Sequence, residues 1–187
     1  MFTSFLTLLY TLLLVLAGSA TASLSPPDAH AYFTLCASSD SKILSSPYTG
    51  IDYLEAKTGD LETCLHLLTI APDFGLIKNY VELLHSSFSE NEYLNIINSK
   101  VETTTGLNMH PLSWLIYGNH PSLSSYLIEM GADVNHIFKK EDGSDVTVLD
   151  IVEFLKGNGA DVGEIEEVVK NAGGEVAREL KGDNKDL

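Results

Sequence analysis

Basic residues are scarce in this chain: its 187 residues include 11 Lys and Arg against 26 Asp and Glu, a formal charge of −15. A surface this acidic repels phosphate, which argues against nucleic acid as the main partner and disfavours electrostatic docking on anionic lipid. Hydrophobic residues make up 44% of the sequence, too many for an acidic disordered chain. The length suits one domain, or one domain with a tail.

Charged side chains are missing altogether from residues 1–22. Residues 5–16 are an apolar run of the length of a signal-peptide core, whereas a bilayer span needs about 20 residues. Ala20-Thr21-Ala22 then fits a cleavage site, although residues 1–4 lack the usual Lys or Arg. We therefore predict a signal peptide over 1–22 and a mature protein that is secreted or luminal and does not bind membrane. The alternative is an uncleaved anchor that tethers the protein to a membrane.

Cysteine is also scarce: the chain has two, Cys36 and Cys64. In an oxidising compartment an even count allows one disulfide, while two buried free thiols are the other reading. Their separation excludes a C-x-x-C redox or zinc arrangement.

Signatures of catalysis and of cofactor binding are absent from the sequence. It contains no G-x-S-x-G, no Walker loop and no G-x-G-x-x-G. Its six histidines have neither H-x-x-x-H nor H-E-x-x-H spacing, and the acidic stretch 141–145 lacks the ligand spacing of a calcium loop. We expect no metal, no cofactor and no enzymatic activity. The competing hypothesis is a small enzyme with a site in residues 70–105.

What the chain does contain, after a Ser- and Pro-rich lead-in over 23–50, is a series of short amphipathic segments. Apolar residues recur at three- and four-residue spacing, as in Leu61, Cys64, Leu65 and Leu68, with no comparable run of period two. This predicts an all-α domain whose short helices must stack on one another to be stable. In the lead-in we expect little structure beyond one short helix over 28–37, with Asp28 as its N-cap.

One segment has a recognisable pattern. It begins with His110-Pro111-Leu112-Ser113-Trp114-Leu115, continues through Asn119-His120, and ends with Gly131-Ala132-Asp133-Val134-Asn135. It resembles an ankyrin repeat, whose pattern T-P-L-H-x-A, G-H and G-A-D-V-N it matches over 26 positions without a gap. Pro111 and Pro121 suit the first positions of two helices, while Asn119 and Gly131 can take the left-handed conformation that ends them.

Weaker matches flank this segment. Thr147-Val148-Leu149-Asp150 resembles the start of a last repeat, and Gly59-Asp60-Leu61-Glu62 resembles the turn of a first one. Residues 74–101 would then be a degenerate unit. The resemblance implies a helix-turn-helix solenoid of three to four repeats over 51–175, followed by a polar tail over 176–187.

A repeat solenoid has a concave surface and no ready-made catalytic pocket, so the resemblance implies a non-catalytic protein-binding module. Its contact positions, in the hairpin loops and on the first-helix face, map to Leu107, Met109, Tyr117, Met130, Ser144 and Val146. The charge is −9 over 23–138 (4 basic against 13 acidic residues) and −6 over 139–187 (7 against 13). We expect a basic or apolar protein partner whose binding weakens with salt.

Overall fold

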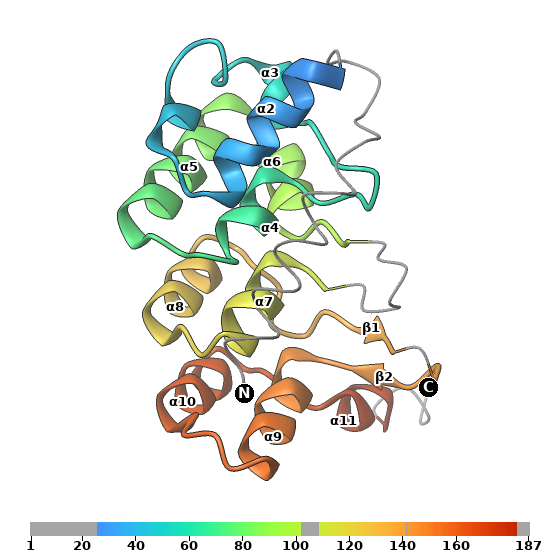
Figure 1. Cartoon of the computed structure of the whole chain (residues 1–187). Helices are drawn as coiled ribbons and strands as arrows, with labels where there is room; N and C mark the ends of the chain where they lie inside the picture. The colour runs from blue at the N-terminus through green and yellow to red at the C-terminus, as the bar shows by residue number, and fades with distance from the viewer. Residues whose placement is uncertain (1–25, 102–108, 141, 183–187) are drawn as a thin grey trace. The chain divides into compact units, whose positions relative to one another are not determined.

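The structure is a computed structural model that describes residues 26–101, 109–140 and 142–182. These residues are predominantly helical, as the sequence pattern predicts (Figure 1). The predicted signal peptide and the predicted contact residue Leu107 lie outside them. Within these ranges, no helix is long and apolar enough to span a bilayer. The chain divides into two compact units, residues 1–87 and 88–187.

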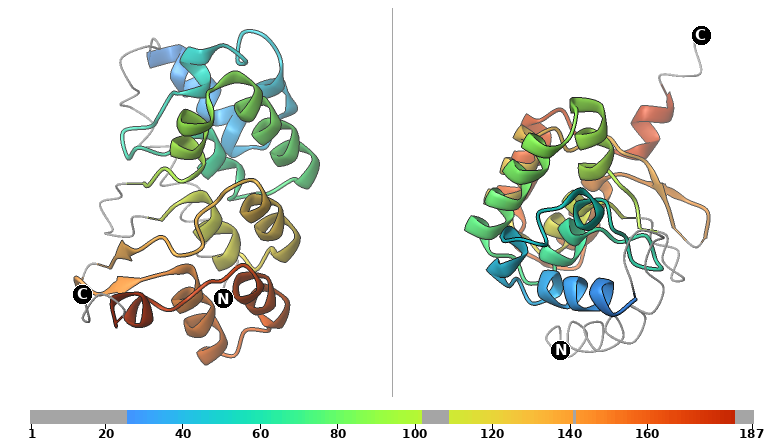
Figure 2. Two further views of the ribbon diagram at one scale, coloured as in Figure 1. Left: turned by 180° about the vertical axis from the view of Figure 1, so that it is seen from behind. Right: turned by 90° about the horizontal axis from the view of Figure 1, so that it is seen from above.

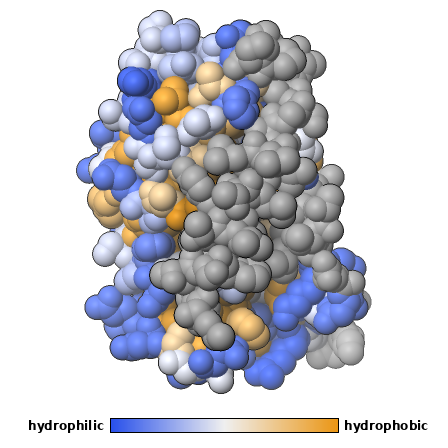
Figure 3. Space-filling view, in the orientation of Figure 1, coloured by the Kyte–Doolittle hydropathy of each residue, from blue (hydrophilic) through white to orange (hydrophobic). Residues whose placement is uncertain are grey.

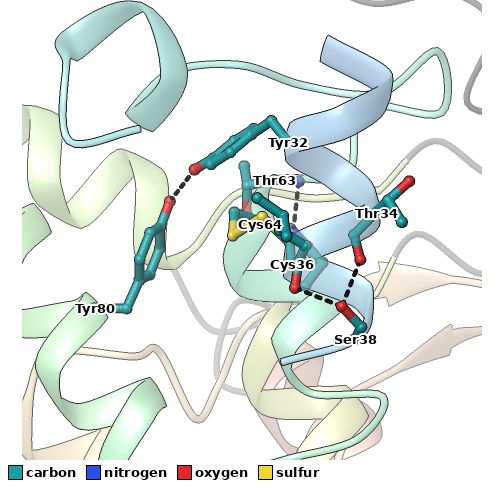
Figure 4. The surroundings of a disulfide bond; sticks show 9 residues. Tyr32, Thr34, Cys36, Ser38, Thr63, Cys64 and Tyr80 are labelled. Carbon is teal, nitrogen blue, oxygen red and sulfur yellow. Dashed lines mark hydrogen bonds between the residues drawn. A yellow bond between two sulfur atoms is a disulfide. The ribbon is translucent and has the colours of Figure 1, made fainter. Parts of the chain in front are cut away.

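The first unit contains five described helical segments, of which η1 is a 3-10 helix. They are α2 (Pro26–Ala37), η1 (Ser41–Leu44), α3 (Ile51–Leu54), α4 (Cys64–Leu68) and α5 (Phe74–Ser87). α2 packs against α4, and α5 contacts both α4 and η1. Cys36 near the end of α2 and Cys64 at the start of α4 form a disulfide between two fully buried positions (Figure 4).

Tyrosine side chains pack in the core of this unit. Tyr32 of α2 and Tyr80 of α5 are both buried, and their hydroxyl oxygens lie 3.0 Å apart (Figure 4). The ring of Tyr32 also contacts the rings of Tyr48 and Tyr53. A buried tyrosine is stable when its hydroxyl has a partner, and this pair satisfies two at once. The lead-in is therefore more ordered than the sequence suggests, because its helix supplies core residues.

The second unit is built from helix pairs. Its helices are α6 (Glu90–Ile97), α7 (Pro111–Tyr117), α8 (Pro121–Glu129), α9 (Val148–Gly157), α10 (Gly163–Asn171) and α11 (Ala177–Gly182). α7 packs on α8 and on α9, and α10 packs on α8 and on α9 (Figures 1 and 2). Between α8 and α9 a hairpin pairs β1 (Phe138–Lys139) with β2 (Asp145–Val146).

The turns between these helices have the backbone conformation that the sequence predicts. Asn119, between α7 and α8, has φ +56°, and Gly131, after α8, has φ +98°. Both values lie in the left-handed region that ends a helix. A larger residue at Gly131 would be strained by the positive φ, and its Cβ atom would come within 2.6 Å of the end of the Leu94 side chain in α6, which would have to move.

Each of α4, α7 and α9 begins with a cap between its N-cap residue and the residue three positions later, and in α4 and α9 this cap is a reciprocal capping box. The three pairs are Thr63 with His66, His110 with Ser113, and Thr147 with Asp150. In α7 the N-cap side chain has the usual role, because Nδ1 of His110 accepts hydrogen bonds from the backbone N–H of Ser113 (3.2 Å) and from its hydroxyl (2.6 Å). The absence of a Thr at position 110 therefore does not leave the helix uncapped.

Two asparagines 37 residues apart join successive segments of the second unit in the same way. Nδ2 of Asn98 donates to the Gly131 carbonyl (3.1 Å), and its Oδ1 accepts from the Asp133 N–H (2.8 Å). Asn135 makes the equivalent bonds to the Gly173 carbonyl (3.0 Å) and the Glu175 N–H (2.8 Å). One amide side chain thus satisfies a donor and an acceptor of the next loop, and the same device occurs twice.

The C-terminal residues differ from the polar tail that the sequence predicts. Val176 and Ala177 are buried, and the N–H of Ala177 donates to the Asp150 carboxylate. In α11, Lys181 forms an ion pair with Asp145 of β2. The apolar pair Val176-Ala177 and these polar contacts hold α11 against the hairpin, which composition alone does not reveal.

Candidate interaction surface

The predicted contact residues have very different exposures. Tyr117, at the end of α7, is 48% exposed, and Ser144 in the hairpin loop is also exposed. Met130 is half-buried at the C-cap of α8, where its carbonyl accepts a hydrogen bond from the Tyr93 hydroxyl. Tyr117 and Ser144 are therefore the two predicted contacts that a partner can reach most readily.

Met109 and Val146 correct the sequence interpretation, because they are 5% and 6% exposed. Each directly precedes the N-cap residue of a helix, and the Val146 backbone pairs with that of the buried Phe138 in the hairpin. Their side chains are buried next to the first turns of α7 and α9. They add almost no surface to a contact with another protein.

Two other large aromatic residues are exposed among the described residues, Phe74 in the first unit and one in the second unit that was not among the predicted contacts. Phe154 of α9 is 56% exposed. It lies seven residues after the N-cap Thr147, and Tyr117 lies seven residues after the N-cap His110. Aligning the two capping residues would have found it, since the equivalent position carries an aromatic residue in both units. We refer to Tyr117 and Phe154 as the ring pair.

The ring pair occupies equivalent positions on two helices that pack against each other. α7 and α9 pack directly against each other, and each also packs on its own partner helix, α8 or α10. If the two helices belong to equivalent repeats, we expect equivalent positions on them to face the same way. Large aromatic side chains are usually buried, so two in equivalent exposed positions mark this face as unusual.

Acidic side chains accompany the ring pair. Glu153 precedes Phe154 on α9 and is exposed. Asp161, also exposed, belongs to the loop before α10, and its carbonyl accepts a hydrogen bond (2.8 Å) from Nδ2 of Asn119, two residues after Tyr117. Hydrophilic side chains gather over α10 in the view of Figure 3. Exposed carboxylates therefore lie on the same helix as Phe154 and on the loop that is bonded to the turn after Tyr117.

The lysines of this region are already engaged. Lys156 of α9 and Lys170 of α10 both donate to the carboxylate of Glu166, each at 2.6 Å. These two ammonium groups lower the pKa of the Glu166 carboxyl to about 2. Neither Glu153 nor Asp161 has an ion-pair partner among the described residues. Glu153 nonetheless contributes to raising the pKa of the Lys170 ammonium group, behind the larger effect of Glu166.

Histidines of the second unit form a buried pair without the features of a metal site. The rings of His110 and His136 lie 5.1 Å apart, and burial lowers the pKa of both, that of His136 to about 4. Nε2 of His110 lies 3.0 Å from the Asp133 carbonyl, while its Nδ1 serves as the helix cap. Over the described ranges, no three His, Cys, Asp or Glu side chains are grouped so as to hold a metal ion.

One carboxyl group of the first unit has a strongly shifted pKa. Glu62, directly before the α4 N-cap, is 5% exposed, and burial raises its pKa to about 7. The Thr58 hydroxyl donates to it (3.2 Å), which opposes the shift. The Thr58 N–H also donates to the Glu62 carbonyl (2.9 Å), and the Glu62 N–H donates to the Thr58 hydroxyl (3.1 Å), so the group belongs to a local loop structure.

The chain matches no protein-family model, no curated protein and no solved structure. The functional argument therefore depends on the geometry described above.

Proposed function

We propose that this protein is a non-catalytic binding module, an ankyrin-like stack of helix pairs that holds a protein partner on the face carrying the ring pair and Ser144. The observation that carries the proposal is the exposure of Tyr117 and Phe154 at equivalent positions of adjacent helices. Exposed aromatic residues cost little conformational entropy when they become buried, and they dominate the energetics of protein interfaces.

Repetition within the second unit supports the ankyrin-like part of the proposal. His110 and Thr147 cap their helices through the same pair of positions, and Asn98 and Asn135 make the same bonds to the next loop. Both equivalences have a period of 37 residues, close to the length of about 33 typical of ankyrin repeats. Repeats of this kind present their first helices and hairpins on one side.

The disulfide supports a secretory location. Cys36 and Cys64 are bonded to each other and buried, and such bonds persist in oxidising compartments. Together with the signal peptide predicted over 1–22, this supports the proposal that the mature protein is secreted or luminal. N-terminal sequencing of the secreted form tests the cleavage, and a protein that still begins at Met1 would instead be the membrane-anchored alternative.

Site-specific photo-crosslinking tests the binding face. A photoreactive phenylalanine analogue is introduced at position 117 or at 154, and the protein is irradiated in its native compartment. The control carries the analogue at Ile51, a residue of the first unit with 45% exposure. We expect one partner to be cross-linked from positions 117 and 154 and not from position 51.

The affinity of the purified partner then decides the proposal. Tyr117→Ala and Phe154→Ala should each weaken binding by about 10- to 100-fold, the effect of removing an interface aromatic residue, while Ile51→Ala should leave binding unchanged. Unaltered circular dichroism spectra would confirm that the variants fold. Equal affinity of all three variants and the unaltered protein would rule out this face.

A further inference from the structure

The buried histidine pair, His110 and His136, lies where the start of α7 meets the loop that follows α8. His110 is fully buried at the N-cap of α7, and the side chain of His136 is 17% exposed. An imidazole ring changes its charge near pH 6.5 in water, and burial disfavours its charged form. The protonation state of the pair therefore affects how firmly these two segments are held together.

The contacts of His110 require its neutral form. A backbone N–H can only donate, so Nδ1, which accepts from the Ser113 N–H at 3.2 Å, carries no hydrogen. A carbonyl can only accept, so Nε2, which lies 3.0 Å from the Asp133 carbonyl oxygen, carries the ring hydrogen. A proton added at Nδ1 would face the Ser113 N–H donor and end the cap of α7.

His136 has no acceptor for a second N–H group. Its Nε2 atom is buried and has no hydrogen-bond partner among the described residues. In the imidazolium form this atom would carry an N–H that remains unsatisfied. Nδ1 of His136 lies 3.8 Å from the Asp133 carboxylate, a contact that favours the charged form. Burial outweighs this contact, because the pKa of His136 is lowered to about 4.

The charges around the pair are nearly balanced. The two ring centroids are 5.1 Å apart, so one imidazolium would repel another, and Lys100 also disfavours protonation of both rings. Among the described residues, Asp133 is the carboxylate that favours it. The helices packed on α7 and the hairpin beside it carry further charged groups, which do not shift the pKa of either histidine. They are Glu129, Lys139, Asp145, Asp150, Glu153 and Lys156.

We propose that the histidine pair is an acid-sensitive device, which holds the start of α7 to the loop after α8 at neutral pH and releases it in acid. Histidines of the unfolded chain take up protons below about pH 6.5, whereas the folded pair takes them up only at lower pH. The unfolded state therefore binds more protons as the pH falls from 6.5 towards 4, and the second unit loses stability over this range. The inference does not depend on the proposed binding function, and its test needs no partner.

Urea unfolding followed by the fluorescence of Trp114 tests the proposal. Trp114 is the single tryptophan of the chain and belongs to α7, so its signal reports the second unit. We expect the urea midpoint of the oxidised protein to be about 1–2 M lower at pH 5 than at pH 7. Other groups with a shifted pKa, His120 and Glu62, are the same in every variant below, so comparison of the variants isolates the pair.

Variants that cannot be protonated assign the fall in midpoint to the pair. His110→Asn keeps a capping side chain at the start of α7, because asparagine is among the best N-cap residues. His136→Phe keeps a ring and removes both nitrogens. The double variant should lose at least half of the fall between pH 7 and pH 5. His30→Gln, which removes an exposed histidine of α2, is the matched control and should show the whole fall.

Two results would overturn the proposal. One is an unaltered protein whose midpoint does not fall between pH 7 and pH 5, and the other is a double variant whose midpoint falls as much as that of the unaltered protein. Should the double variant fail to fold at pH 7, His136→Phe alone decides, since it leaves the cap of α7 in place. A fall in that variant equal to the fall in the unaltered protein would again overturn the proposal, and a smaller fall would support it.

Discussion

The burial of Glu62 lowers the stability of the folded protein at neutral pH. Its pKa rises from an ordinary value of 4.5 to about 7, so the folded protein holds the carboxyl proton more tightly than the unfolded chain does. The stabilisation that results is complete below pH 4.5 and is lost as the pH rises from 4.5 to 7. Above pH 7 a buried charge remains, with the Thr58 hydroxyl as one hydrogen-bond donor to it.

We therefore expect Glu62→Gln to be more stable than the unaltered protein at pH 8, by up to about 3 kcal/mol, and to have nearly the same stability at pH 4.5. Urea unfolding at the two pH values measures this difference. Glu179→Gln removes one negative charge from an exposed site and reports the effect of net charge alone. A stability of Glu62→Gln below that of the unaltered protein at pH 8 would contradict the prediction.

Helix caps are the devices that define the elements of this fold. Short helices cannot offset the cost of nucleation alone, so satisfying the first backbone N–H groups matters more for them than for long helices. His110 caps α7 and also contacts the Asp133 carbonyl, whereas His120 precedes α8 without a side-chain cap. Both histidines are followed by proline at the first position of a helix, so His120 serves as an internal control for His110.

We expect His110→Ala to lower the free energy of unfolding by about 2–4 kcal/mol, since it removes a cap, empties a buried site and removes the side chain that contacts the Asp133 carbonyl. His120→Ala should cost less than about 1 kcal/mol. Chemical unfolding of both variants at pH 7, where burial keeps the pKa of both groups below its usual value, provides the comparison. Equal losses for the two variants would mean that the cap of α7 contributes nothing.

At the scale of the whole molecule, the disulfide acts within one of the two compact units. Cys36 and Cys64 are 28 residues apart, and both belong to the first unit. In the chain-entropy description, closing a loop of this length stabilises the fold by about 3–4 kcal/mol. Because each unit has its own core, the consequences of reduction should be local.

Reduction with a dithiol should therefore lower hydrogen-exchange protection in α2, α4 and α5 and leave α9 and α10 nearly unchanged. Mass-spectrometric hydrogen exchange of the oxidised and reduced protein measures both units in one experiment. The Cys36→Ala/Cys64→Ala variant, treated with the same dithiol, controls for effects of the reagent itself. An equal loss of protection in both units would show that the molecule unfolds as one cooperative whole.

Much of the second unit could be predicted because its signals are local. Pro111 and Pro121 are compatible with the first turns of two helices, and Asn119 and Gly131 tolerate the positive φ that ends them. The first unit was harder to predict, because its lead-in has a Ser- and Pro-rich composition. Its order depends on a contact between Tyr32 and Tyr80, which are 48 residues apart in the chain. Of the candidate contacts, Tyr117 followed from the repeat pattern, and Phe154 was missed although the same pattern contains it.

The sequence by itself determined the helical class, the turns and the excess of negative charge. Periodicity and backbone preference depend on residues close together in the chain, and net charge depends on composition alone. Only the tertiary structure decided which side chains face water. It buries Met109 and Val146, exposes Phe154, pairs Cys36 with Cys64 and raises the pKa of Glu62. Burial is set by which segments pack together, and that is decided by contacts between residues far apart in the chain.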